Sequence, residues 1–215
     1  FRNYLGEAYL QFGEPINLNA LLKEYPLSDY SSEKDWLFKV TPVLGKKIMT
    51  TINDSTVVTS TALFSLAILN SDGFSISNRE LVSRIELLKS LLAEDKYSAK
   101  TLICEKTGEE IIDQMRKLGF LSKEDINDRI SLTNLEAAKL SFYRNNISHL
   151  LIFESLICGF FQYQKEIVKE DLLQSIKMIY PFLKEEFFLK WDEAYLDQLI
   201  NLSLIHISEP TRRSY

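Results

Sequence analysis

One short segment of this 215-residue chain has the composition of a β-strand, and a single strand cannot form a sheet by itself. Residues 8–12 (Ala-Tyr-Leu-Gln-Phe) partly alternate and are rich in strand-forming side chains, and residues 13–15 (Gly-Glu-Pro) follow them as a turn. We therefore expect this strand to be the last member of a sheet whose other strands are missing from the chain. The rest of the chain must then be mostly helical.

Helical spacing dominates the chain after residue 39. Apolar side chains recur every three or four positions, and capping boxes at residues 77–80 and 133–136 open two of the helices. The helices that we expect begin at Asn17, Pro42, Val57, Ser77, Glu109, Thr133 and Leu172. The helix from residue 133 is expected to be the longest and to reach about Tyr163, whereas Pro181 should end or kink the last one.

These patterns divide the chain into four parts. Residues 1–24 would end a domain that contains a sheet, residues 25–39 form a surface connector without a sustained period, and residues 40–201 form a helical domain. Residues 202–215 look like a sequencing adaptor translated in frame, so we expect a library artefact there, with a natural terminal segment as the alternative. The fold class is mainly α, with an N-terminal remnant strand of an α/β domain followed by an α-helical C-terminal domain.

The composition disfavours several classes of function. Thirty acidic and 25 basic residues give a net charge of −5, so we expect no nucleic-acid partner. The longest apolar stretch, residues 150–161, is interrupted by Glu154 and is shorter than the ~18–20 residues that cross a bilayer. No signal region follows Phe1, and the chain begins as if cut from something longer. Cys104 and Cys158 stand apart among apolar residues, which indicates small buried thiols rather than a disulfide.

No complete active site can be assembled from the sequence. The chain has two histidines, His149 and His206, and Glu154 follows the first by five positions. On a continuous helix those two side chains would lie ~140° apart after one full turn, so they cannot form a His–carboxylate dyad. One internal histidine and two distant cysteines do not make a zinc site, and the scattered glycines make no phosphate loop. We therefore expect no catalytic residue, no metal and no cofactor in this chain.

The strongest candidate for a site is a polar group set in an apolar stripe. Asn145 and His149 are one helical turn apart, and Asn146 is close to the same face. If they are buried, they form a hydrogen-bond network that joins helices, because an unpaired amide or imidazole there costs ~1–3 kcal/mol. The alternative is that Tyr143, Arg144, Asn145 and His149 line or support a ligand site.

Three stretches of the chain together resemble one protein family. They are residues 6–16 (GEAYLQFGEPI), residues 143–149 (YRNNISH) and residues 180–192 (YPFLKEEFFLKWD). Their order and spacing resemble the C-terminal half of the bacterial membrane-associated glycerol-3-phosphate 1-O-acyltransferases, from residue 1 to about residue 202. The resemblance implies that residues 1–24 end the acyltransferase domain and that the helical domain packs on it.

The resemblance implies an enzyme that transfers a fatty acyl group from acyl-CoA or acyl carrier protein to the sn-1 hydroxyl of glycerol 3-phosphate, giving lysophosphatidic acid for phospholipid synthesis. It implies a peripheral or monotopic protein on the cytoplasmic face of the inner membrane. The family's catalytic His and Asp, four residues apart, would lie upstream of this chain, so the fragment alone is expected to be inactive. Two alternatives are a related dihydroxyacetone-phosphate acyltransferase and a non-catalytic helical interaction domain.

Overall fold

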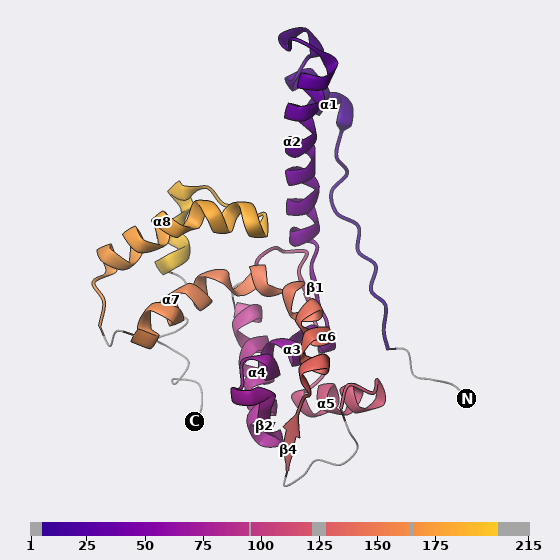
Figure 1. The fold of residues 1–215 in the computed structure, drawn as a ribbon, viewed down its shortest axis with the longest axis vertical. Coiled ribbons are helices and arrows are strands. Elements are labelled where there is room, and N and C mark those ends of the chain that lie inside the picture. Colours follow the sequence, from indigo (N-terminus) through magenta and orange to yellow (C-terminus); the bar gives the residue numbers. More distant parts are fainter. Residues whose placement is uncertain (1–5, 95, 122–127, 164–165, 202–215) are drawn as a thin grey trace.

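A computed structural model describes residues 6–94, 96–121, 128–163 and 166–201 of the chain. The expected adaptor-derived segment, residues 202–215, lies outside the described residues. The described part is mainly helical, as the sequence predicts (Figure 1). Its α-helices are α1 (Leu18–Glu24), α2 (Glu33–Asp54), α3 (Ser60–Leu69), α4 (Asn78–Glu94), α5 (Gly108–Lys117), α6 (Asn134–Asn145), α7 (Ile152–Tyr163) and α8 (Lys169–Phe187).

Short elements connect these helices. The 3-10 helices are η1 (Leu27–Asp29), η2 (Asp72–Phe74), η3 (Ser148–Leu151) and η4 (Glu193–Tyr195). The strands are β1 (Val57–Val58), β2 (Ser75–Ser77), β3 (Leu102–Ile103) and β4 (Arg129–Ser131). Within the described part, none of the helices is both long enough and apolar enough to span a bilayer.

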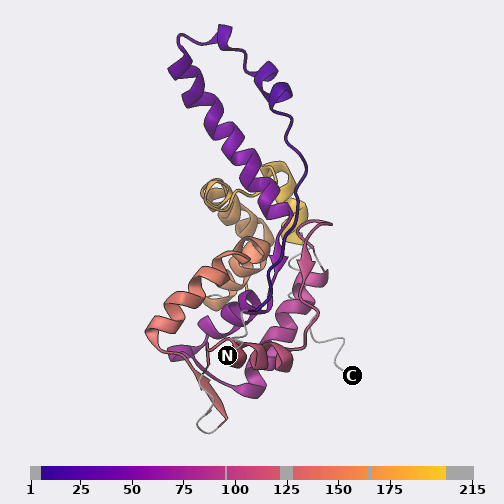
Figure 2. The same cartoon turned by 90° about the vertical axis from the view of Figure 1, so that its right-hand side faces the viewer.

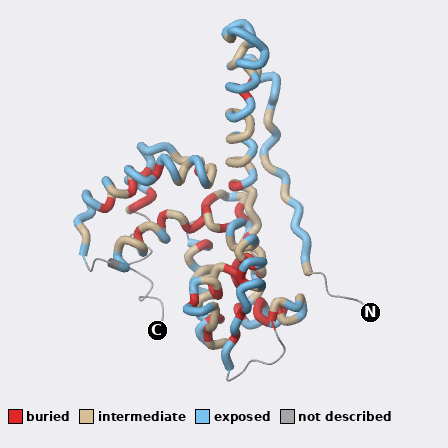
Figure 3. Tube along the Cα trace, viewed as in Figure 1, coloured by how far each residue is buried: buried red, intermediate tan, exposed pale blue. Residues whose placement is uncertain are grey.

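Helix α3 is the centre of the body, and α4, α5 and α6 pack around it. The hydroxyl of Thr59 caps the helix by accepting a 3.2 Å hydrogen bond from the main-chain nitrogen of Ala62. Leu63, Phe64 and Ile68 have no exposed surface, so the helix is buried on more than one side. The buried residues gather around this helix (Figure 3).

The strands that the structure contains were not predicted. Strand β1 pairs in parallel with β3, so that Val57 lies opposite Leu102, and β2 pairs antiparallel with β4, so that Ile76 lies opposite Ile130. The helix expected over residues 57–69 therefore begins at Ser60. The first residues of that range are β-branched and pair as a strand instead.

The strand predicted at residues 8–12 is wrong. These residues are irregular, and no other segment in the described part of the chain pairs with them. They run beside α2 in the opposite direction (Figures 1 and 2). The side-chain amide of Gln11 donates a 2.6 Å hydrogen bond to the main-chain oxygen of Lys100, and Glu7 forms an ion pair with Lys106. Among the described residues, this segment is therefore held by side-chain contacts and not by strand pairing.

Helix α2 begins well before the predicted start at Pro42, so residues 33–39 of the expected connector belong to a helix. Its N-cap is Ser32, whose hydroxyl accepts a 3.2 Å hydrogen bond from the main-chain nitrogen of Asp35. The helix continues through Pro42, which cannot donate the usual hydrogen bond to the turn before it. Residues 18–42, here called the arm, project from the body (Figures 1 and 2).

The single long helix predicted over residues 133–163 is also wrong at its centre. Its capping box is confirmed, because Thr133 and Glu136 bond to each other's main-chain nitrogens. The helix nevertheless ends at Asn145, and Ile147 leaves the helical conformation with φ −120° and ψ 0°. Ile147 is completely buried, so packing of this side chain fixes a turn that carries η3 and redirects the chain into α7.

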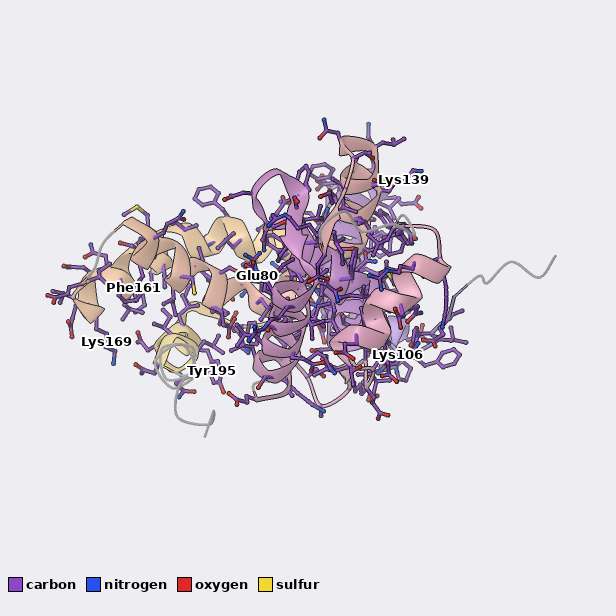
Figure 4. The ribbon with its side chains drawn as sticks, turned by 90° about the horizontal axis from the view of Figure 1, so that it is seen from below. Glu80, Lys106, Lys139, Phe161, Lys169 and Tyr195 are labelled. Carbon is purple, nitrogen blue, oxygen red and sulfur yellow. The ribbon has the colours of Figure 1, made fainter. Side chains whose placement is uncertain are left out.

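Helices α7 and α8 form an outer pair on one side of the body. Seen from below, Phe161 and Lys169 lie at the far end of this pair, on the opposite side of the molecule from Lys106 (Figure 4). Pro181 lies inside α8 and does not end it. The cysteines are free thiols, but Cys158 is exposed on α7, which corrects the expectation that both are buried.

Candidate functional site

The largest cavity that we describe, of about 690 Å³, lies where the inner end of α2 meets the body. Its walls come from residues 49–61, the turn after α6, the end of α8 and the N-terminal segment that runs beside α2. Predicted site residues Tyr143, Asn145 and His149 all line this central cavity, together with Asn146. The cavity is also lined by α5 and the turn after it, through Gln114, Leu118 and Phe120. The fold therefore brings a locally recognised motif against four segments that are distant in sequence.

His149 forms the buried floor of the cavity. The turn after α6 directs its ring inward, where it is only 5% exposed. Its Nε2 lies 3.2 Å from the Oγ1 of Thr56, and that hydroxyl donates a 2.8 Å hydrogen bond to the main-chain oxygen of Asn53. Because the hydroxyl has one hydrogen, which Asn53 accepts, we assign the imidazole proton to Nε2, from which it is donated to Thr56.

The environment keeps the imidazole of His149 neutral. Burial lowers its pKa to about 4, since the charged form loses its hydration. The main-chain oxygen of Asn53 and the carboxylate of Asp54 oppose this shift, whereas the ammonium of Lys190 adds to it. An imidazole with this pKa is a weak base near neutral pH. Because the ring is not in its charged imidazolium form there, it has no acidic proton to deliver. His149 is therefore suited to bracing the cavity and not to proton transfer.

The structure separates the other predicted site residues. Asn145 and Asn146 have exposed side chains, so the interpretation of a buried network is wrong for both and holds only for His149. Arg144 does not line the cavity; its Nη2 and Nε lie 3.2 and 3.3 Å from the Oδ1 of Asn145. Phe142, expected to continue the apolar stripe, is 70% exposed. Arg144 thus orients an amide on the cavity wall.

An aromatic cluster supports the cavity from behind. The ring of Tyr97 meets His149 edge to face at a centroid distance of 5.1 Å and meets Trp191 at 4.7 Å. The ammonium of Lys190 lies 4.3 Å from the centroid of the Tyr97 ring and 2.8 Å from the carboxylate of Asp54. Trp191 also packs against Phe153 in this cluster, at a centroid distance of 5.6 Å.

Some residues of the site were missed by the sequence analysis. Asn53 and Thr56 come from the end of α2 and the start of β1, and Gln114 comes from α5. Gln114 could have been found, because Thr107 and Glu110 form a third capping box that fixes the register of α5. Asn53 and Thr56 lie on either side of an ordinary helix end, and no local sequence pattern marks them as site residues.

The described lining of the cavity combines uncharged polar groups, apolar side chains and two carboxylates. These include amides, hydroxyls and apolar side chains such as Met49 and Ile52, and the described lining includes no lysine or arginine. The carboxylates present are Glu7 and Glu186, and the hydrogen bond from Lys106 lowers the pKa of Glu7. Such a surface suits a ligand with neutral hydrogen-bonding groups and apolar portions. A phosphate would need cations from elsewhere.

Comparison with known proteins identifies the family of the chain. A profile described as the glycerol-3-phosphate acyltransferase C-terminal region matches residues 1–209. The chain belongs to this family. A glycerol-3-phosphate acyltransferase of Shewanella loihica is 33% identical over 208 residues, and one of Glaesserella parasuis is 31% identical over 219 residues. No solved structure matches the chain.

The matched stretches are nearly all of this chain but a small part of its relatives. They cover 91% and 94% of this chain, yet 26% and 27% of the length of these two acyltransferases. The chain therefore spans about a quarter of the curated relatives that it matches. The family and the C-terminal position inferred from residues 6–16, 143–149 and 180–192 are both confirmed.

Proposed function

We propose that this chain is the C-terminal part of an enzyme that transfers a fatty acyl group from acyl-CoA or acyl carrier protein to the sn-1 hydroxyl of glycerol 3-phosphate, giving lysophosphatidic acid. The observation that carries the proposal is the family match along nearly the whole chain. The relatives are named for glycerol 3-phosphate, which favours this acceptor over dihydroxyacetone phosphate. We place the enzyme on the cytoplasmic face of the inner membrane, as a peripheral or monotopic protein.

In this proposal the catalytic base belongs to the region that precedes the chain. The hydroxyl of Thr56 and the imidazole of His149 are neighbours in the central cavity, but the hydroxyl donates its hydrogen to a main-chain oxygen, and burial lowers the pKa of His149 so that it is a weak base. The contribution of this part is binding and support. Tyr143 and Asn145 contact the ligand, Arg144 positions Asn145, and His149 braces the wall beneath them.

The ligand group that the cavity fits best is the neutral portion of the acyl donor. The thioester arm shared by acyl-CoA and acyl carrier protein carries amides, hydroxyl and methyl groups, which match a lining of amides, hydroxyls and apolar side chains. The phosphate of glycerol 3-phosphate fits less well, because the described lining offers carboxylates and no cation.

Steady-state kinetics of the full-length enzyme tests this assignment. Replacing Asn145→Ala should raise the KM for the acyl donor several-fold and leave the KM for glycerol 3-phosphate unchanged. Arg144→Ala should have the same effect in weaker form, since it acts through Asn145. Asn134→Ala is the matched control, because this asparagine is exposed on the same helix and does not line the cavity.

Two results would count against the proposal in different ways. A raised KM for glycerol 3-phosphate alone would mean that the cavity serves the acceptor. If the full-length protein bound neither an acyl thioester nor glycerol 3-phosphate, the enzyme assignment itself would be wrong. The isolated chain should show no acyl transfer.

A further inference from the structure

The arm carries more apolar surface than a solvent-exposed helix pair needs. Phe38, on the outer half of α2, is 76% exposed. Other arm residues that are about half exposed are Leu18, Leu27 and Leu37. In Figure 3 the arm shows little of the buried surface that fills the body. Apolar side chains gathered at the end of a projection mark a contact surface more often than a free one.

Two of these side chains, Leu37 and Phe38, border a shallow groove on α2. Leu37, Phe38 and Pro42 form its apolar surface, and Ser32 and Asp35 lie at its polar rim. An apolar centre with a polar rim is the usual anatomy of a protein interface. The groove lies at the outer end of the helix, far from the core around α3 (Figure 2).

The charge of the arm argues against a bilayer as the occupant. Residues 18–42 contain three lysines, at positions 23, 34 and 39, against four acidic residues, at positions 24, 29, 33 and 35, which leaves a net charge of −1. A segment that lies on an anionic membrane normally has a basic polar face. A protein surface is the better match for an apolar patch whose rim carries one charge of each sign, Lys34 and Asp35.

The path of the chain indicates which protein surface covers the groove. The curated relatives extend to about four times the matched length, and the match is to their C-terminal region. Residues 6–17 run beside α2 and lead directly to the arm (Figure 1). These residues begin beside α5, where Glu7 forms its ion pair with Lys106, so a region that precedes them is attached at the body and not at the tip of the arm. The covalent link still raises its local concentration at the groove.

We propose that the apolar face of the arm, centred on Leu37 and Phe38, is the docking surface for the region that precedes this chain in the full-length protein. The proposal rests on the family assignment and not on which substrate the enzyme uses. The arm then spans the two parts, and its apolar side chains are buried by the preceding region.

Site-specific photo-crosslinking of the full-length protein in its membrane tests the proposal. Phe38 is replaced by p-benzoylphenylalanine, and the products are identified by mass spectrometry. The expected product is an intramolecular cross-link to a peptide that precedes residue 1, at a yield several-fold above that from position 142. Phe142 is the matched control, an aromatic residue on α6 with comparable exposure, 70% against 76%.

Each other product would overturn the proposal. A lipid adduct would make the arm a membrane contact, a cross-link between two chains would make it a dimer interface, and no product above the control would leave it in solvent. Phe38→Asp should also lower the melting temperature of the full-length protein, whereas Phe142→Asp should not. The cross-link is read without an activity assay, so a failure of the proposed reaction would leave this result intact.

Discussion

The side-chain amide of Asn53 donates a 2.7 Å hydrogen bond to the main-chain oxygen of Phe187, which ties the inner end of α2 to the end of α8. The same amide lies 3.3 Å from the oxygen of Phe188, a residue held in the left-handed conformation at φ 51°. A non-glycine residue in that conformation costs ~1–2 kcal/mol. Asn53 therefore holds a strained helix end against the cavity wall.

Replacing Asn53→Ala should destabilise the chain by about 1–3 kcal/mol, because the oxygen of Phe187 loses its donor and the strained turn loses its support. Urea unfolding followed by circular dichroism measures the change. Asn134→Ala, at an exposed position, should stay within about 0.5 kcal/mol of the parent. Equal effects from both substitutions would contradict the assigned role of Asn53.

His149 predicts a specific loss of stability in acid. Its folded pKa is about 4, below its ordinary value of 6.5, so the unfolded chain takes up the proton first as the pH falls. The folded chain is stabilised relative to the unfolded chain wherever His149 is neutral in both, which is above pH 6.5. The free energy of unfolding falls by roughly 3 kcal/mol as the pH is lowered from 6.5 to about 4.

The variant His149→Gln isolates this effect. Carboxylates with lowered pKa values, such as Glu136 and Asp192, titrate in both proteins and cancel in the difference. The gap in unfolding free energy between parent and variant should narrow as the pH falls through this window. A gap that does not change with pH would show that His149 is not held neutral in the folded chain.

Gly13 allows the N-terminal segment to approach α2. A Cβ at this position would lie 2.3 Å from the Cγ2 of Thr51, whose χ1 is restricted in a helix. Gly13→Ala should push the segment away from α2, and cleavage of residues 6–17 by a protease should become several-fold faster. The double variant Gly13→Ala with Thr51→Ala should restore the parental rate.

Gly45→Ala provides the control for that experiment. Gly45 lies inside α2, and nothing lies within 4 Å of a Cβ placed there. This substitution should leave the cleavage rate unchanged and stabilise the helix by about 0.5–1 kcal/mol. Faster cleavage in Gly45→Ala would mean that α2 itself, and not the close approach, controls the segment.

The predictions that succeeded rest on local rules. The capping box at Thr133 and Glu136 and the helix start at Asn17 are predicted from a few neighbouring residues and are confirmed. The end of α5 before Gly119 follows the same kind of local rule. Gly119 has φ +77°, which a glycine adopts without strain. Such features need no knowledge of distant segments.

The predictions that were wrong concern features that depend on segments distant in sequence. The break after Asn145 depends on Ile147 reaching a core that other helices build, and periodicity alone reads through it. Residues 8–12 have strand-forming side chains, but pairing depends on a neighbouring strand. The start of α2 was missed because Pro42 resembles a first helical residue and the helix runs through it.

The sequence predicts some of the residues that line the cavity but not their partners. Tyr143, Asn145 and His149 lie in one short motif, and the structure brings them to one cavity. Their partners come from far along the chain: Thr56, which accepts the hydrogen bond of His149, is 93 residues away. No single-sequence pattern encodes that pairing, so the choice between bracing and ligand contact needed the fold.

Helix α2 has one more consequence. Its 22 residues extend about 33 Å, with Phe38 near one end and Asn53 at the other. If the helix moves as one body, a tilt of its outer end displaces its inner end as well. A contact that moves the outer end of α2 therefore also moves Asn53 in the wall of the central cavity. The shape of the cavity thus depends on where the outer end of the helix is held.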